Sequence, residues 1–253
     1  MNQTPTSRAF SESPAKLLRQ LRSRILFRLF DPGVRVKNKL LRFADADVTL
    51  ETINTIINGE SPLNADKFLA GMPRMSTIGI GYLINAIVRG MNPSHAYLNV
   101  GVWQGFTFLA GLAGNSEKRC IGVDNFSQFG GPREESLAGY ARYRSPSSAF
   151  HDMDYEAYFA TEHAGPIGLY FYDGKHDYAD QLRALELAEP FFSPDTLILV
   201  DDTNDEQVRG ATLDFMRGRS GRYELLLDER TAGNSHPTFW NGLMILGPAD
   251  AVV

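Results

Sequence analysis

Short apolar runs alternate with polar, helix-like segments along the whole chain after Pro93. A strand can return to a parallel neighbour only through a long crossover, which is usually a helix. The alternation therefore predicts an α/β fold with a mostly parallel sheet covered on both faces by helices. The seven expected strands are 96–102, 119–124, 148–152, 167–173, 195–202, 222–228 and 239–247.

Helical spacing of apolar residues predicts helices over 105–113, 154–163, 178–191 and 205–217. No helix separates the last two expected strands, and such a pair is joined more easily as an antiparallel hairpin. The segment 125–147 is rich in Gly, Pro, Ser and Arg, so we expect a lid or binding loop there. Residues 93–253 are thus expected to form one α/β domain.

The N-terminal part of the chain has a different pattern. Residues 1–14 are polar and are expected to be a disordered tail. Residues 15–92 are expected to be a helical region with a basic amphipathic helix over 15–30, a second helix over 49–59 and a third over 76–90. We expect the polar connector 61–75 to lie near the mouth of a substrate site.

Charge is distributed unevenly. Residues 1–42 contain ten Lys or Arg against two acids, a net charge of +8, whereas the rest of the chain has 15 basic and 28 acidic residues, a net charge of −13. Nucleic-acid binding by the main domain is therefore not expected. The basic segment 15–42 has three interpretations: it packs on its own domain or a second subunit, it lies on an anionic membrane surface, or it binds a partner.

The single cysteine, Cys120, falls in an apolar run, so neither a disulfide framework nor a thiolate metal cluster is expected. No apolar run approaches the roughly 20 residues that span a bilayer, and the N-terminus is too polar for a secretory signal. A cytoplasmic location is expected.

The stretch from Ala96 to Asp124 combines an expected strand, a glycine turn from Gly101 to Gly105, a short helix and a second strand that ends in an acid. The glycines allow close approach of a ligand, and the acid can accept hydrogen bonds from ribose hydroxyls. The pattern predicts a nucleoside pocket, although Asp124 could instead cap a turn. The absence of G-x-G-x-x-G argues against a nicotinamide or flavin dehydrogenase.

Three acids, Asp173, Asp201 and Asp202, follow two further expected strands. Carboxylates gathered on one rim of a parallel sheet suit a hard divalent cation such as Mg²⁺. His176 lies three residues after Asp173, where a neutral imidazole could take a proton from an acceptor hydroxyl. The alternative is that these side chains cap the helices that follow.

Together these segments resemble the class I S-adenosylmethionine-dependent methyltransferases, in particular the small-molecule O-methyltransferase branch, over residues 95–250. The resemblance implies a Rossmann-like sheet and S-adenosylmethionine as cofactor. The segments that carry it are Leu98-Asn99-Val100-Gly101-Val102-Trp103-Gln104-Gly105, Ile121-Gly122-Val123-Asp124, Leu169-Tyr170-Phe171-Tyr172-Asp173-Gly174-Lys175-His176 and Leu199-Val200-Asp201-Asp202.

The resemblance also implies roles for single residues. Gly101, Gly105 and the backbone at Trp103 match the turn that contacts the methionine part of the cofactor, and Asn99 stands where the family usually has an acid that supports the cofactor's ammonium group. Asp124 matches the ribose-binding acid. Asp154 matches the position that reaches the adenine amino group, with Asp152 as a competing alignment, and Asp173 lies beside the methyl donor.

In catechol-type and macrolide-sugar O-methyltransferases, acids at the positions of Asp173, Asp201 and Asp202 hold a metal, and catechol-type enzymes have a basic residue at that of His176. The function this implies is O-methylation of a small hydroxylated acceptor, such as a sugar or secondary metabolite, with Asp173 and His176 as catalytic residues and assistance by Mg²⁺ or another divalent cation. The alternative is a catalytically inactive methyltransferase-fold binding or scaffold protein, docked through its basic N-terminal helix.

Overall fold

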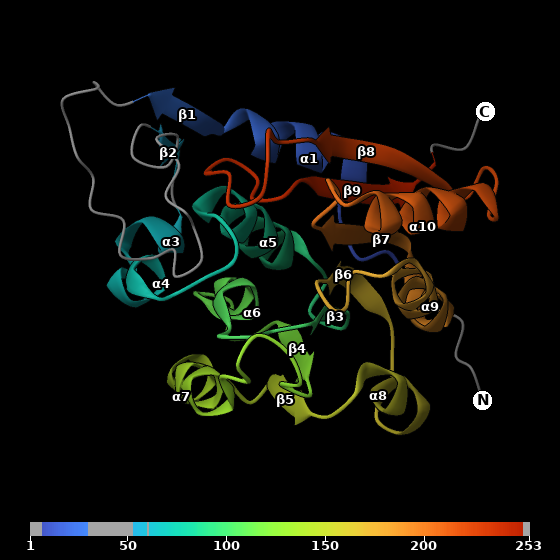
Figure 1. The fold of residues 1–253 in the computed structure, drawn as a ribbon, viewed down its shortest axis with the longest axis horizontal. Coiled ribbons are helices and arrows are strands. Elements are labelled where there is room, and N and C mark those ends of the chain that lie inside the picture. Colours follow the sequence, from blue (N-terminus) through green and yellow to red (C-terminus); the bar gives the residue numbers. More distant parts are fainter. Residues whose placement is uncertain (1–6, 30–52, 60, 250–253) are drawn as a thin grey trace.

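A seven-stranded sheet forms the centre of the molecule in the computed structural model, which describes residues 7–29, 53–59 and 61–249. Its strand order is β5-β4-β3-β6-β7-β9-β8 (Figure 1). The strands are β3 (Ala96–Val100), β4 (Arg119–Asp124), β5 (Ser148–Asp152), β6 (Ile167–Tyr172), β7 (Phe192–Asp201), β8 (Tyr223–Glu229) and β9 (Leu243–Pro248).

The neighbouring strands from β5 to β7 are parallel, and β9 runs antiparallel to both β7 and β8. The last two strands thus form the expected antiparallel pair, with β9 inserted between β7 and β8. The predicted Rossmann-like α/β class is confirmed. Because the parallel strands all end at one edge, the polar residues that follow them gather there.

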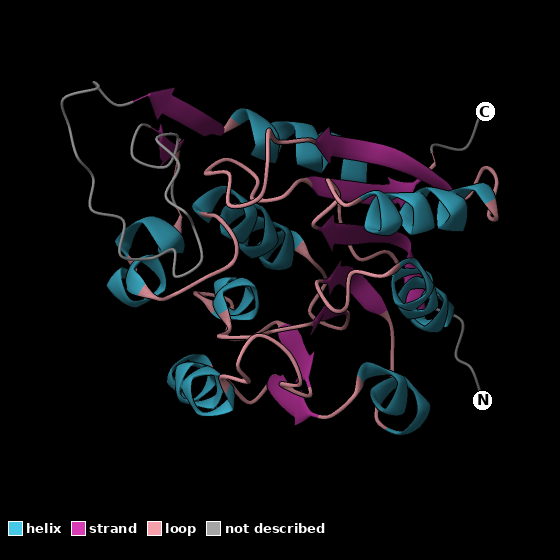
Figure 2. Ribbon diagram, in the orientation of Figure 1, coloured by secondary structure: helices cyan, strands magenta, loops and turns pink. Residues whose placement is uncertain are grey.

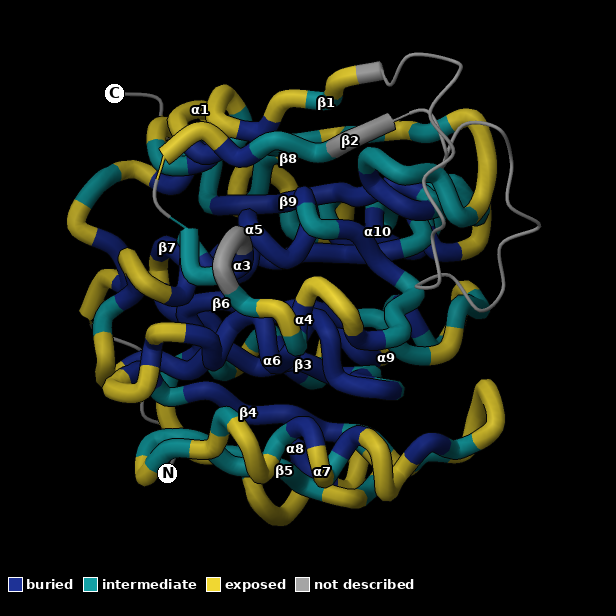
Figure 3. The backbone as a smooth tube through the Cα atoms, turned by 90° about the vertical axis from the view of Figure 1, so that its left-hand side faces the viewer, coloured by how far each residue is buried: buried dark blue, intermediate teal, exposed yellow. Residues whose placement is uncertain are grey.

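Helices cover both faces of the sheet (Figure 2). Alternate strand residues serve the two faces: Tyr97 and Phe171 belong to one apolar cluster, and Leu98 and Tyr170 to the other. Figure 3 shows the strands as the buried interior of the molecule. One face is covered by α5 (Ile78–Gly90), α6 (Phe106–Leu112) and α7 (Arg133–Tyr143), the other by α8 (Tyr155–Thr161), α9 (Tyr178–Ala188), which runs into the short 3₁₀-helix η1 (Glu189–Phe191), and α10 (Glu206–Arg217).

The segment 125–147 contains the helix α7, so the prediction of a loop across all of it is wrong. The helix could not be predicted from apolar spacing, because its buried residues are the small Ser136 and Gly139 rather than a regular apolar stripe. Only its partly buried Tyr140 and Tyr143 reach the apolar cluster beneath. Residues 125–132, between β4 and α7, do form a loop.

The N-terminal helix is shorter than predicted. Helix α1 (Pro14–Ser23) ends before β1 (Ile25–Leu29), which pairs antiparallel with β2 (Ile53–Ile57). The expected helices 15–30 and 49–59 are therefore wrong at these strands; residues 30–52 lie outside the described ranges. β-branched isoleucines and the partner strand override the helical spacing. The third expected helix is confirmed as α5, and the connector before it holds α3 (Pro62–Ala65) and α4 (Lys67–Gly71).

The described part of the predicted disordered tail is packed. Ala9 and Phe10 are buried, and their N–H groups donate to the carboxylate of Asp195 at 2.5 and 2.9 Å. Leu18 and Leu21 of α1 lie in the same apolar cluster. Of the three interpretations of the basic helix, the structure shows its apolar face packed on its own domain. No helix among the described residues is long and apolar enough to cross a bilayer.

Candidate active site

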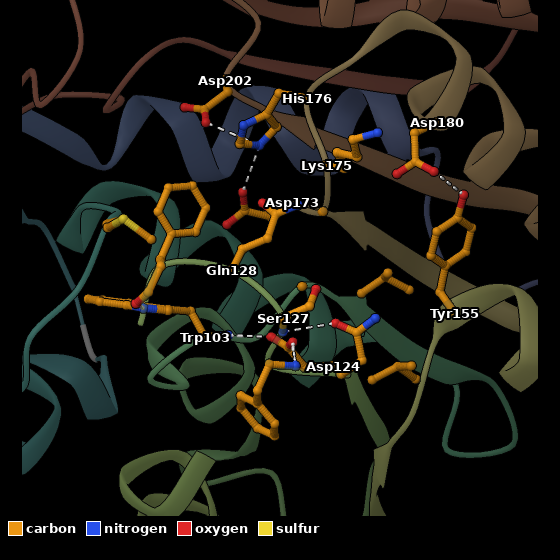
Figure 4. Close-up of a pocket in the computed structure, with 18 of the residues that line it drawn as sticks. Trp103, Asp124, Ser127, Gln128, Tyr155, Asp173, Lys175, His176, Asp180 and Asp202 are labelled. Atoms are coloured by element: carbon orange, nitrogen blue, oxygen red, sulfur yellow. Dashed lines mark hydrogen bonds and ion pairs between the residues drawn. The ribbon is translucent and has the colours of Figure 1, made fainter. Parts of the chain in front are cut away.

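A cavity of about 560 Å³ lies at the edge where the parallel strands end, within the usual range for small-molecule sites. Its lining combines the turn after β3, the end of β4, the start of α8 and the segments after β6 and β7 (Figure 4). Seven of the ten predicted site residues line it: Gly101, Trp103, Asp124, Asp154, Asp173, His176 and Asp202.

The turn after β3 is packed directly against the end of β6. Gly101 has φ of +81°, and a Cβ there would lie 1.9 Å from the carbonyl oxygen of Asp173. Only glycine fits both the backbone conformation and this contact. The close approach brings the predicted cofactor turn and the predicted catalytic acid into one site.

Asp124 organises this turn. One of its carboxylate oxygens accepts the N–H groups of Val102 and Trp103, each at 2.7 Å, and the other accepts that of Phe126 at 2.7 Å. The side chain is half-buried and also lines the cavity. Asp124 is therefore a turn cap in the structure, and a carboxylate keeps acceptor capacity beyond these three hydrogen bonds.

Asn99 and Gly105 are outside the lining of the cavity. Asn99 is fully buried beneath the turn, where its amide donates to the carbonyl of Gly101 and its oxygen accepts from Tyr97 and Thr107. Gly105, with φ of +104°, closes the turn and precedes α6. Both residues support the turn in the structure, and their predicted contact with a cofactor stays a prediction.

Trp103 forms one wall of the cavity. Its backbone has a positive φ of 47°, and its indole N–H donates to the carbonyl of Phe129 at 3.1 Å. Phe126 and Phe129 also have positive φ values, so the loop after β4 is held in an uncommon conformation over the site. These two phenylalanines were not predicted as site residues, because aromatic residues in a polar loop carry no periodic signal.

Of the two alignments for the adenine-binding acid, the structure favours Asp154. Asp154 lines the cavity and caps α8 by accepting the N–H of Glu156 at 2.8 Å. Asp152 instead forms an ion pair with Arg133 and is outside the lining.

Asp173, His176 and Asp202 form a compact cluster, and one ligand atom from each lies within 4.8 Å of the others. The Nε2 atom of His176 is 3.4 Å from Asp173 Oδ1 and 3.2 Å from Asp202 Oδ2 (Figure 4). Carboxylate and imidazole groups at these distances are a donor set suited to a divalent cation.

The third predicted metal ligand, Asp201, is not part of this cluster. Asp201 is the last residue of β7 and is 2% exposed, whereas Asp202 follows with a left-handed φ of 54°. Successive residues at a strand end point in different directions, so only one of the pair enters the cavity. Among the described residues, neither oxygen of Asp201, nor Oδ1 of Asp202, makes a regular hydrogen bond.

Burial and the interactions among the charged groups shift the pKa values of Asp173, His176 and the neighbouring acids. Burial raises the pKa of Asp173 to about 6, against the opposing effect of His176. Burial, with the nearby charges of Asp173 and Asp202, raises the pKa of Asp201 far above its usual range. Burial also raises the pKa of Asp202. For His176, burial lowers the pKa, but the carboxylates outweigh it and bring the pKa to about 9.

Further residues of the cavity were not singled out from the sequence. Asp180, at the start of α9, accepts the hydroxyl of Tyr155 at 2.8 Å (Figure 4). It also accepts the hydroxyl of Tyr172 at 2.9 Å. Asp205 caps α10, and Trp240 and Asn241 line the cavity from the loop before β9. Only the position of Asp180 and Asp205 in a first helical turn could have drawn attention to them.

The amino-acid sequence matches a family model described as a methyltransferase domain over residues 98–203. This range runs from β3 to just past β7 and includes both the glycine turn and the acid cluster. A search of curated proteins finds no match.

Solved structures share the fold at low sequence identity. A putative O-methyltransferase from Klebsiella pneumoniae has a TM-score of 0.56 and 15% identity, covering 76% of this chain and 91% of that one. The O-methyltransferase TomG of Streptomyces achromogenes, involved in tomaymycin synthesis and crystallised with S-adenosylmethionine, has a TM-score of 0.56 and 14% identity, covering 76% and 91%.

An O-methyltransferase from Bacillus cereus, in complex with S-adenosylhomocysteine, has a TM-score of 0.53 and 13% identity, covering 74% and 88%. At these identities the likeness concerns the fold, while the family model concerns the sequence itself. The match at the sequence level supports the predicted resemblance to methyltransferases: residues 98–203 match a methyltransferase domain.

Proposed function

We propose that the protein transfers a methyl group from S-adenosylmethionine to a hydroxyl oxygen of a small acceptor, assisted by a divalent cation. The observation that carries the proposal is that the glycine turn and the Asp173, His176 and Asp202 cluster share one cavity, with Gly101 against the backbone of Asp173. The O-methyltransferases that share the fold support the same choice of acceptor atom.

The cavity offers a consistent place for the cofactor. Its methionine part would lie against the turn at Gly101 and Trp103, its ribose near Asp124 and its adenine toward Asp154. Asp124 already accepts three backbone N–H groups, but a carboxylate has about four acceptor sites and retains capacity for a ribose hydroxyl.

The acid cluster fits a divalent cation. Asp173 and Asp202 would hold it, with the buried carboxyl group of Asp201 close to both. When bound, the cation would hold the acceptor oxygen, lower the pKa of its hydroxyl and favour the neutral form of His176.

His176 is the proposed proton acceptor. Its imidazole is held between two carboxylates, which orient the ring toward the cavity. The chain needs to supply no covalent nucleophile, because methyl transfer is a direct displacement at the sulfonium carbon. Its acceleration depends on orientation and on the local electrostatic field.

The acceptor would occupy the part of the cavity bordered by Met75, Trp103, Trp240 and Asn241. These side chains offer apolar surface with few hydrogen-bonding groups, which suits a small hydroxylated compound. We keep a sugar or secondary metabolite as the proposed acceptor class and a cytoplasmic location as the proposed compartment.

Calorimetry tests the cofactor assignment. We expect S-adenosylmethionine and S-adenosylhomocysteine both to bind the full-length protein. Absence of binding by either compound at millimolar concentration would contradict the proposal. Methyl transfer from labelled S-adenosylmethionine to a panel of hydroxylated compounds, with and without chelator, then tests the cation: activity lost in chelator and restored by Mg²⁺ supports it, and full activity in chelator contradicts it.

A further inference from the structure

The outer surface of α1 and β1 is basic and has no role in the site described above. We call five of its exposed residues the basic face: Lys16, Arg19, Arg24, Leu26 and Arg28. We propose that the basic face docks the protein on an anionic lipid surface.

The fold turns these residues outward together. Leu18, Leu21 and Ile25 are buried in one apolar cluster, so α1 and β1 both present their opposite sides to solvent. Along α1 the exposed Lys16 and Arg19 lie about one helical turn apart, and along β1 the exposed Leu26 and Arg28 alternate with Ile25 and Phe27. Figure 3 shows exposed segments of both elements along the same edge of the molecule.

The charges of the basic face are largely uncompensated. Lys16 pairs with Glu12, and Arg22 beside the face pairs with Glu229. No acidic side chain of the described residues forms an ion pair with Arg19, Arg24 or Arg28. Because residues 43–253 carry a net charge of −13, an anionic surface would attract this end of the molecule and repel the rest. The charge distribution therefore also orients the docked protein.

Leu26 favours a lipid surface over a nucleic acid as the partner. It is 45% exposed, one of the few large apolar side chains in the described chain that are so accessible. A leucine flanked by arginines can enter the headgroup region while the guanidinium groups bind lipid phosphates. A phosphate backbone would neutralise the arginines but gives the leucine no apolar environment.

Vesicle sedimentation with the full-length protein tests the proposal. We expect binding to phosphatidylcholine vesicles that contain roughly a third phosphatidylserine, weakening as salt increases, and no binding to phosphatidylcholine alone. Replacing Arg19, Arg24 and Arg28 together by Gln should weaken binding by about 100-fold. Leu26→Ser should weaken it several-fold without changing its salt dependence.

The control is Arg142→Gln with Arg144→Gln, which removes two exposed charges at α7 and should leave vesicle binding unchanged. Thermal melting and S-adenosylmethionine binding of every variant check that the fold is intact. Equal binding to both vesicle types, no binding, or an unaffected triple variant would overturn the proposal. So would binding to duplex DNA or RNA without vesicle binding, or a dimer lost in the triple variant without vesicle binding.

Discussion

The two halves of the cavity rim differ in how well their polar groups are satisfied. At the ends of β3 and β4, Asp124 accepts three backbone N–H groups and Asn99 is bonded to three partners. At the ends of β6 and β7, Asp201 and one oxygen of Asp202 lack regular hydrogen-bond partners, and the carboxylates raise one another's pKa.

This difference separates polar groups that the chain itself satisfies from carboxylates that it leaves partly uncompensated. Buried carboxylates cost stability unless hydrogen bonds or opposite charges compensate them. In the β3 and β4 half, hydrogen bonds within the chain compensate the buried polar groups, so this half is preorganised. The β6 and β7 half is only partly compensated, by His176, so its negative charge remains available to a cation.

The largest expected effect concerns the preorganised half. Gly101→Ala would place a Cβ 1.9 Å from the carbonyl oxygen of Asp173 in a left-handed conformation. We expect the free energy of unfolding to fall by at least about 4 kcal/mol, with loss of S-adenosylmethionine binding. Denaturant unfolding measures this.

Gly105→Ala is the matched control for the same turn. Its φ is also positive, but the nearest side-chain atom to a Cβ would be 3.4 Å away, on Leu109. We therefore expect the free energy of unfolding to fall only by the cost of backbone strain, about 1–2 kcal/mol. Equal losses in the two variants would show that the contact with Asp173 is unimportant.

Asp124→Ala removes the acceptor for three backbone N–H groups. We expect a loss of about 2–3 kcal/mol in stability and weaker cofactor binding, because the turn loosens. Asp124→Asn keeps one acceptor oxygen and should lose less. If Asp124→Ala melts like the wild type, the β3 and β4 half is not held together by this carboxylate.

Asp201→Asn should raise the stability of the folded protein, whereas the preceding substitutions lower it. The pKa of Asp201 is raised above its ordinary 3.8, so the folded protein binds protons that the unfolded chain releases. This contribution to stability is present at low pH and is lost as pH rises through the folded pKa. In chelator at neutral pH, we expect Asp201→Asn to be about 1–2 kcal/mol more stable than the wild type, with a flatter dependence of melting temperature on pH. A destabilised variant would contradict the contrast between the two halves.

The α/β domain could be predicted closely because buried parallel strands are continuous apolar runs whose identity depends little on context. The strands β1 and β2 could not, because their pairing joins residues 25–29 with 53–57, and local spacing alone favours a helix. Helix α7 was missed for a related reason, since it packs through Ser136 and Gly139.

The sequence was sufficient to predict which strand ends form the site, but not how each side chain is oriented there. The glycine turn, Asp124, Asp173 and His176 follow from motif spacing, and all four line the cavity. Which of two adjacent acids enters the cavity depends on the backbone angle at Asp202, and the structural role of Asn99 depends on its burial. Neither property is encoded in spacing along the chain.

Titration of the chelator-treated protein with Mg²⁺, followed by calorimetry, tests the central claim most directly. We expect the wild type to bind Mg²⁺ and Asp202→Asn, in which asparagine tolerates the left-handed backbone, to bind Mg²⁺ at least about tenfold more weakly. Asp205→Asn, which keeps the cap of α10 in the same cavity, should bind like the wild type. Absence of Mg²⁺ binding by the wild type, or equal affinity in Asp202→Asn, would contradict the central claim.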